Sequence, residues 1–157
     1  MNKVVFAIVY VILLVMCALF GFRYLYNAYA VNSYNQGNYA VSLEPLENFN
    51  LFEKYVLPYN QGNIHYMKGE YIEAVRAYDM ALSKNPPEKK ECDIRVNKAL
   101  AMLKTVEADY LNPDASNIEH TKEVLRQARE VLLEVGCASD DGNGHDEDAQ
   151  TLKEEID

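Results

Sequence analysis

Residues 59–87 read YNQGNIHYMKGEYIEAVRAYDMALSKNPP, and the spacing of small and aromatic residues in this stretch decides the fold. Such residues recur there at intervals of three, four and seven positions, which is typical of helix faces. They are Gly62, Tyr66, Gly69, Tyr71, Ala74, Tyr78 and Ala81. The pattern breaks at Gly69 and stops at Pro86-Pro87, and both residue types end helices. It predicts two short helices, 59–68 and 71–84, packed as an antiparallel hairpin.

This hairpin resembles a tetratricopeptide repeat, a pattern of about 34 residues. The positions that carry the resemblance are Tyr59, Asn60, Gly62, Asn63, Tyr66, Gly69, Tyr71, Ala74, Tyr78, Ala81 and Pro86. The stretch departs from the pattern at Pro58, Gln61 and His65, where Trp, Leu and Tyr are usual. The resemblance implies an all-α fold, a short α-solenoid that binds other proteins or peptides.

A single repeat cannot bury both of its faces, so neighbouring helices are expected. Residues 88–137 are interpreted as a degenerate, stretched repeat, whose second helix, 118–135, carries core positions at the same spacing. These are Leu125, Ala128, Leu132 and Val135. An insertion, DYLNPDASN at 109–117, separates its helices, and Ser116 or Asn117 could cap the second. Residues 24–58 are interpreted as membrane-proximal helices that form a partial repeat.

The pentapeptide YNQGN occurs at residues 34–38 as well as at 59–63. The first copy is expected to end a helix over 22–36, and Gly37 and Tyr39 there correspond to Gly69 and Tyr71. The second copy begins the complete repeat. The two copies therefore share local turn and helix chemistry more than equivalent positions.

From Val4 to Phe22 the chain reads VVFAIVYVILLVMCALFGF, without a charged residue, Asn, Gln or Pro. A helix of this length, rising about 1.5 Å per residue, spans roughly the 30 Å of a bilayer core. The sequence therefore predicts a transmembrane anchor within residues 1–23. A cleaved signal peptide is the alternative, because Ala28-Tyr29-Ala30 resembles a cleavage site.

The positive charges beside this helix favour one orientation. Lys3 and the amino terminus outnumber Arg23, so the amino terminus is expected in the cytoplasm and the C-terminal domain outside it, in a single-pass protein of the cell membrane. Disulfides persist in that setting. Because Cys17 would lie in the bilayer, Cys92 and Cys137 form the candidate disulfide. Two buried, unpaired thiols are the alternative.

The C-terminal part is strongly acidic, with fifteen Asp and Glu against four Lys and Arg from Thr105 to the end. Such a charge repels nucleic acid, so no nucleic-acid partner is expected. Residues 138–157 are interpreted as an acidic loop and a capping helix whose Ala149 and Leu152 face inward. The loop sequence DDGNGHDED fails the calcium-loop pattern, with Asp146 at an apolar position and Gln150 in place of the bidentate Glu.

Motifs for catalysis and cofactor binding are missing from the sequence. It contains no G-x-S-x-G, phosphate-binding loop or dinucleotide fingerprint, so no enzyme activity, catalytic residue or cofactor is predicted. His65, His120 and His145 are not in a zinc-binding arrangement, and the cysteines form no C-x-x-C, so no metal site is predicted.

The tetratricopeptide resemblance implies a concave groove lined by the first helix of each repeat. The candidate groove residues are Asn60, Asn63, Ile64, Met67, Arg95 and Lys98. Asn and basic side chains would suit the backbone of an extended peptide or a terminal carboxylate. These residues could also be ordinary exposed polar positions.

The whole arrangement is similar to small bacterial membrane proteins that accompany MoxR-type AAA+ ATPases and von Willebrand factor A domain proteins, as in aerotolerance (Bat) operons. The resemblance implies such proteins as partners and a scaffold or assembly role. The alternative function is a cation-responsive or cell-envelope-binding module that acts through the acidic C-terminal segment.

Overall fold

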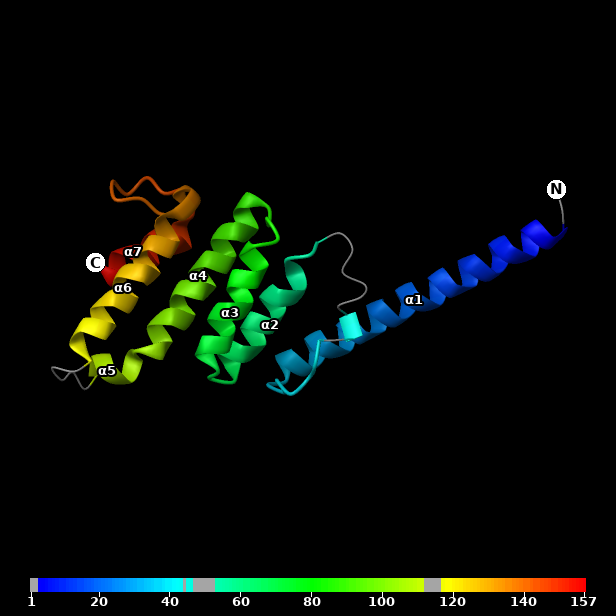
Figure 1. Cartoon of the computed structure of the whole chain (residues 1–157), viewed down its shortest axis with the longest axis horizontal. Coiled ribbons are helices and arrows are strands. Elements are labelled where there is room, and N and C mark those ends of the chain that lie inside the picture. Colours follow the sequence, from blue (N-terminus) through cyan, green and yellow to red (C-terminus); the bar gives the residue numbers. More distant parts are fainter. Residues whose placement is uncertain (1–2, 44, 47–52, 112–116) are drawn as a thin grey trace. The chain divides into compact units, whose positions relative to one another are not determined.

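The computed structural model describes residues 3–43, 45–46, 53–111 and 117–157, and it contains helices and no strand within these ranges. The prediction of an all-α fold is therefore confirmed. The chain forms two compact units, Met1–Leu51 and Phe52–Asp157. Figure 1 labels the helices of both units.

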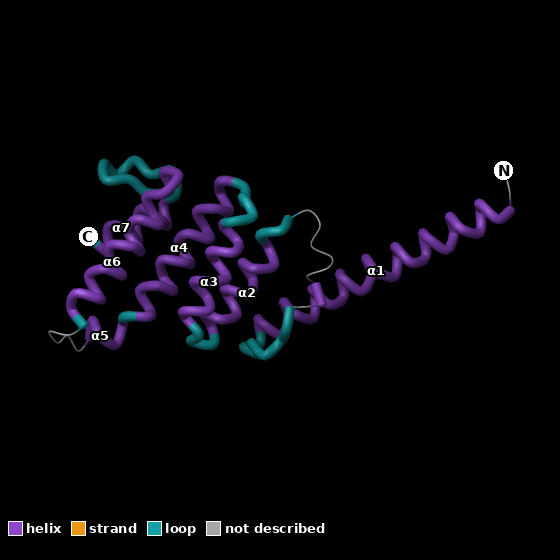
Figure 2. The backbone as a smooth tube through the Cα atoms, viewed as in Figure 1, coloured by secondary structure: helices purple, strands orange, loops and turns teal. Residues whose placement is uncertain are grey.

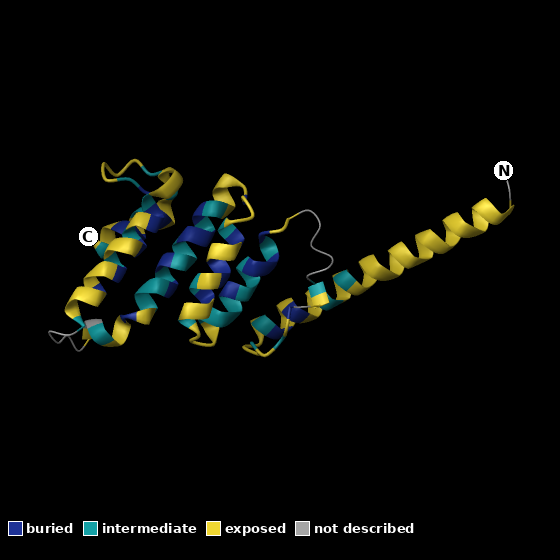
Figure 3. Ribbon diagram, viewed as in Figure 1, coloured by how far each residue is buried: buried dark blue, intermediate teal, exposed yellow. Residues whose placement is uncertain are grey.

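The first unit consists of a long helix and the segment after it. Helix α1, Lys3–Asn35, is long and apolar enough to cross a membrane. Its apolar side chains from Val4 to Phe22 are exposed along the helix (Figure 3). Further along, the Tyr26 hydroxyl donates to the carbonyl of Ser42 at 2.7 Å, and Ala30, Ser33 and Leu43 are buried. The returning chain therefore covers the end of α1 and leaves the apolar stretch bare.

The partial repeat expected over residues 24–58 is not seen as a helix hairpin. Its first helix, 22–36, is the continuous end of α1, whereas residues 38–43 form turns and irregular chain. Pro45 lies shortly beyond and cannot donate a helix hydrogen bond. The remaining part of this expectation falls on residues 44 and 47–52, which lie outside the described residues.

The second unit holds the repeat. Helices α2, Val56–Met67, and α3, Tyr71–Leu82, form the antiparallel hairpin, and α4, Glu88–Thr105, packs against α3. A short helix α5, Glu107–Leu111, precedes α6, Ile118–Leu133, which packs on α4. Figure 2 shows α2, α3, α4 and α6 side by side, with α7, Glu147–Ile156, against the last of them.

The core of this unit has two buried clusters, and small residues allow the helices to approach. Ala74, Tyr78 and Ala81 of α3 pack with Ile94 and Ala101 of α4. The second cluster joins α4, α6 and α7 through Cys92, Ala99, Ala128, Leu132, Cys137, Ala138, Ala149 and Leu152. Ala149 and Leu152 thus face inward, as the sequence indicates for a capping helix.

The end of α6 differs from the expectation. The helix stops at Leu133, and Val135, expected as a buried core position, is exposed in a short 3₁₀ turn, Glu134–Gly136. Val135 has φ of 52° and Gly136 has φ of 77°. This left-handed turn ends the helix and brings Cys137 back toward α4, so the chain reversal determines the position of Val135.

The cap expected for α6 also differs. Ser116 lies outside the described residues, and Asn117 occupies the N-cap position without a capping hydrogen bond from its side chain. Its amide instead donates to Asp109 of α5 at 3.3 Å. This bond connects the two ends of the insertion within the described residues.

Candidate functional site

Residues expected to line a groove lie on α2 and α4, and the structure gives several of them internal roles. The Tyr78 hydroxyl donates to Asn63 Oδ1 at 2.8 Å. The Asn97 amide donates to the Tyr59 hydroxyl at 3.0 Å and to Asn63 Oδ1 at 3.3 Å. Asn63 therefore connects three helices, and its carbonyl oxygen is already occupied by two donors.

Arg95 has a different role from the expected one. Its side chain is buried, and its guanidinium contacts Glu91 at 2.6 Å and Glu134 at 2.6 Å. Glu91 is one turn earlier on α4, whereas Glu134 belongs to the turn after α6. Two carboxylates of the protein thus neutralise this cation, which fixes the end of α6 against α4 and leaves no open guanidinium for a peptide carboxylate.

Lys98 also forms an ion pair inside the protein. Its ammonium lies 2.6 Å from Asp79 Oδ1, and this pair links α4 to α3. Asp79 is half exposed, so the pair is accessible to solvent at one side. Such a pair contributes little to stability, about 1 kcal/mol or less, and its cation can still be shared with a ligand.

The rest of the candidate set forms one face of α2. Asn60, Ile64 and Met67 succeed one another at intervals of four and three residues, so they lie on the same side of the helix. Asn60 and Ile64 are partly exposed, and Met67 is exposed. We call these three residues the α2 face; it combines apolar surface with one amide.

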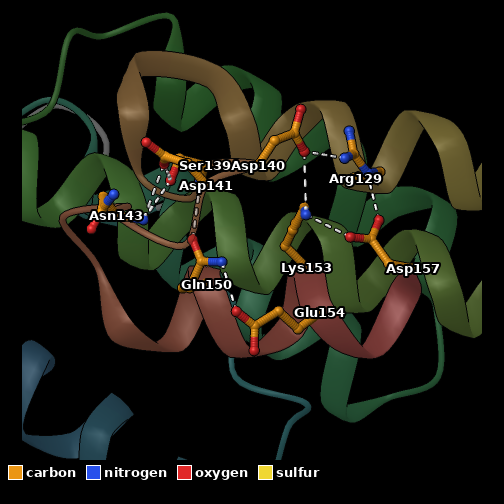
Figure 4. A network of polar contacts seen from close by, with 9 residues as sticks. All are labelled: Arg129, Ser139, Asp140, Asp141, Asn143, Gln150, Lys153, Glu154 and Asp157. Atoms are coloured by element: carbon orange, nitrogen blue, oxygen red, sulfur yellow. Dashed lines mark hydrogen bonds and ion pairs between the residues drawn. The ribbon is translucent and has the colours of Figure 1, made fainter.

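The acidic C-terminal segment is internally paired in the structure, as Figure 4 shows. Asp140 bonds to Arg129 and to Lys153, and Asp157 bonds to the same two cations. Hydrogen bonds from Lys153, and to a smaller extent the interaction with Arg129, lower the pKa of Asp157 and that of Asp140 below the usual range. Each of these two carboxylates thus already has two cationic partners.

The loop before α7 uses its other polar groups in the same way. The Ser139 hydroxyl and Asn143 lower the pKa of Asp141 to about 2. Asp146, at the apolar position of the failed calcium pattern, accepts from the backbone N–H of Ala149 at 2.9 Å and caps α7. Gln150 accepts from the N–H of Ser139 at 2.9 Å. These bonds shape the loop and attach it to α7.

A disulfide joins Cys92 of α4 to Cys137 after α6, with a Cα–Cα distance of 5.6 Å. His145 lies beside it, with Nε2 3.3 Å from Cys92 Sγ. Sequence spacing could not find this neighbour, because 53 positions separate His145 from Cys92. The only sequence signal was that Gly142 and Gly144 allow the loop after Cys137 to turn back.

Sequence analysis also missed a hollow of about 410 Å³ between α4, α5, α6 and α7. Apolar side chains line much of it, among them Leu103, Leu125 and Ile156, and the charged Lys104 and Glu107 line it as well. The Thr121 hydroxyl in its lining is buried and has no hydrogen-bond partner among the described residues.

Comparison with known proteins bears on the repeat. Residues 59–88 match the family model described as Tetratricopeptide repeat, which covers most of α2, all of α3 and the first residue of α4. This confirms the resemblance of the stretch. No curated protein and no solved structure matches the chain. The resemblance to proteins that accompany MoxR-type ATPases finds no support in these comparisons.

Proposed function

We propose that the protein is a membrane-anchored tetratricopeptide-repeat protein that binds other proteins as a scaffold or assembly factor. The observation that carries the proposal is the complete repeat hairpin at residues 59–88, because such repeats typically bind proteins. The α2 face of Asn60, Ile64 and Met67 is the proposed contact surface, and Lys98 of α4 is proposed to contribute to it. Arg95 and Asn63 position these helices rather than contact the partner.

The anchor is part of the proposal. The length and composition of α1 support membrane insertion, and the chain that returns over α1 begins to cover it only near Tyr26. The disulfide between Cys92 and Cys137 supports a domain outside the cytoplasm, because disulfides persist there. The anchored form is expected to stay in the membrane pellet after carbonate extraction, whereas cleavage at Ala30 would release a soluble domain.

The chemistry of the α2 face favours a peptide or helix with apolar side chains and a free backbone amide or carbonyl. Asn60 can pair with such a backbone group, while Ile64 and Met67 supply apolar contact. Membrane proteins of the MoxR-type ATPase and von Willebrand factor A systems are the candidate partners suggested by the sequence resemblance.

Photo-crosslinking in native membranes tests the contact surface. A photoreactive residue replaces Ile64 or Met67 in the full chain, and the matched controls carry it at Ile72 or Met80, which are exposed on α3. We expect one defined partner to be crosslinked from the α2 positions and lost when Asn60→Asp is added. Equal crosslinking from α3, or none from α2, would contradict the proposed surface.

No observation within the described residues favours the alternative of a cation-responsive acidic segment. Asp140 and Asp157 are paired with Arg129 and Lys153, and Asp146 caps a helix. A cation would have to displace these partners. Calcium at millimolar concentration is therefore expected to leave the melting temperature of the full chain unchanged.

A further inference from the structure

We propose that Cys92, Cys137 and His145, completed by Glu88, bind one Zn²⁺ ion when the disulfide is reduced. The same two cysteines would then have two exclusive states, a disulfide and a metal thiolate. This proposal concerns only the second unit and does not depend on the proposed partner-binding role.

The positions of the ligand atoms support three ligands of a site, and Glu88 lies beside one of them, His145, and can supply the fourth. The two sulfurs and an imidazole nitrogen of His145 all lie within 4.8 Å of one another. His145 Nε2 is 3.3 Å from Cys92 Sγ and 3.5 Å from Glu88 Oε1. In tetrahedral zinc sites, with Zn–S of about 2.3 Å and Zn–N of about 2.0 Å, neighbouring ligand atoms are roughly 3.3 to 3.8 Å apart. After reduction the two sulfurs must separate, and the exposed side chain of Glu88 must rotate toward them.

The backbone holds these ligands in place. The N–H of His145 donates to the carbonyl of Gly136 at 3.1 Å, and the N–H of Asp146 donates to the carbonyl of Cys137 at 3.0 Å. A side chain at Gly144 would meet the carbonyl of Cys137 at 2.5 Å, so the loop can pass this closely only because that residue is glycine. His145 is thus fixed beside Cys137 by contacts that do not involve its imidazole ring.

The ligands on α4 also have suitable spacing. Glu88 and Cys92 are four residues apart in the first turns of the helix and therefore lie on one face. Cys92 and Cys137 are buried, whereas His145 and Glu88 are exposed, so an ion can enter from the solvent side. Two thiolates, an imidazole and a carboxylate form a ligand set that suits Zn²⁺.

Reduction and metal binding are two separate steps. A dithiol reductant supplies two electrons and two protons to the disulfide, which becomes two thiols, while the reductant itself becomes a disulfide. Zn²⁺ then replaces the two thiol protons, which go to solvent, and neutral His145 coordinates through Nε2. Glu88 contributes one carboxylate oxygen.

Metal titration of the full chain in detergent tests the site. The Cys17→Ser background removes the remaining thiol, dithiothreitol reduces the protein, and the reagent is removed without oxygen before Co²⁺ or Zn²⁺ is added. We expect one equivalent of Co²⁺ to produce the visible bands of tetrahedral cobalt and a thiolate charge-transfer band, and Zn²⁺ to displace it. The oxidised protein should produce neither band.

Variants assign the ligands. His145→Ala should weaken Zn²⁺ binding by at least about tenfold, the loss caused even by removing an outer partner of a metal ligand. The matched control is His120→Ala, which changes an exposed histidine of α6 outside the site. This variant should bind Zn²⁺ as the background protein does. Cys92→Ser removes one of the two thiolates and should weaken both binding and the charge-transfer band, and Glu88→Gln should weaken binding while the band persists.

Folding is monitored separately by circular dichroism. Reduced His145→Ala should keep the helical signal of the reduced background protein, so its weaker binding cannot be ascribed to unfolding. Reduced background protein that binds no more metal than Cys92→Ser would overturn the proposal, whether it is folded or unfolded. Binding unaffected by His145→Ala would overturn it as well, and unchanged binding in Glu88→Gln would remove Glu88 from the site.

Discussion

The two copies of YNQGN have the same five residues and different structures. At residues 34–38 the pentapeptide ends α1, and Gly37 has φ of 75°. At residues 59–63 it lies inside α2, and its glycine, Gly62, is buried against the ring of Tyr78. Because the five residues are identical in the two copies, the surrounding chain and its packing, rather than propensity within the pentapeptide, decide between a helix end and a helix interior.

The structural counterpart of the first copy is the turn between α2 and α3. Gly37 N–H donates to Tyr34 and Asn38 N–H to Ser33, just as Gly69 N–H donates to Tyr66 and Glu70 N–H to His65. This is the Schellman arrangement of a helix end. The pairs Tyr34–Tyr39 and Tyr66–Tyr71 are both edge-to-face, with centroid distances of 5.3 and 5.5 Å. The shared unit is therefore Y-x-x-G-x-Y.

The chain beyond this turn differs between the two regions. After Gly69 the chain forms α3, which provides the Tyr78 ring that covers Gly62. After Gly37 the side chain of Asn38 accepts from the N–H of Ala40 at 3.2 Å, a local bond that competes with helix formation. A complete hairpin thus requires a second helix to pack on the first, as well as the turn.

The largest expected effect is at Gly62. A Cβ there would lie 2.5 Å from Tyr78 Cε1, and Tyr78 is fully buried, so Gly62→Val should lower the free energy of unfolding by about 3 kcal/mol through overpacking. Urea unfolding of the full chain, monitored by circular dichroism, measures the change. Gln61→Val, the adjacent position on α2, is the control and should have a much smaller effect. Equal losses would mean that close packing on Tyr78 is not the reason this copy stays helical.

A smaller effect is expected at the turn glycines. No atom within 4 Å obstructs a Cβ at Gly69, but its φ of 77° is unfavourable for other residues. Gly69→Ala should therefore cost the second unit about 1 to 2 kcal/mol, and Gly69→Asn less, because Asn tolerates left-handed backbone. Gly37→Ala introduces the same strain in the first unit and should leave the urea midpoint of the second unchanged. A loss of similar size from Gly37→Ala would show that the two units unfold together.

The sequence predicts the features that depend on regular spacing along the chain. Helices 59–68 and 71–84, and the burial of Ala74, Tyr78 and Ala81, result from one periodic pattern and agree with α2, α3 and their core. The different roles of the two pentapeptides were also accessible, since one precedes a strong repeat pattern and the other comes after the apolar helix.

Features that depend on distant partners were not accessible from spacing. Arg95 is buried because Glu134, 39 positions later, returns to it, and a basic residue on a helix face otherwise indicates exposure. Val135 has the periodicity of a core residue, yet the turn that carries Cys137 to α4 displaces it. His145 reaches Cys92 only through the same reversal. Tertiary packing determines all three.

A third test concerns the hydrogen bond from the Tyr78 hydroxyl to Asn63, the last residue of the second copy. The equivalent residue of the first copy, Asn38, accepts instead from the nearby N–H of Ala40. Tyr78→Phe removes the donor to Asn63, whose oxygen keeps the bond from Asn97, so the expected loss is about 1 kcal/mol. Tyr24→Phe, an exposed position on α1, is the control and should leave the unfolding midpoint unchanged. An unchanged midpoint in Tyr78→Phe would assign the stability of the hairpin to packing of the ring alone.

The smallest effect is expected from acid, and it should begin away from both pentapeptides, in the loop and α7. The pKa of Asp141 is lowered to about 2 by Ser139 and Asn143, and that of Asp157 is lowered by Lys153 and Arg129. A carboxylate whose pKa is lower in the folded than in the unfolded chain stabilises the fold above its unfolded pKa, and this contribution is lost as the pH falls toward the folded value. Amide exchange, corrected for the intrinsic effect of pH, should therefore show protection in α7 falling between about pH 4 and pH 2 while that of α2 and α3 persists.

Asp141→Asn should flatten this dependence in the loop, whereas Asp148→Asn, in the first turn of α7, should not. Simultaneous loss of protection in α2 would show that the C-terminal helix and the repeat hairpin form one cooperative unit, in which acid at one end weakens the packing that keeps the second YNQGN helical.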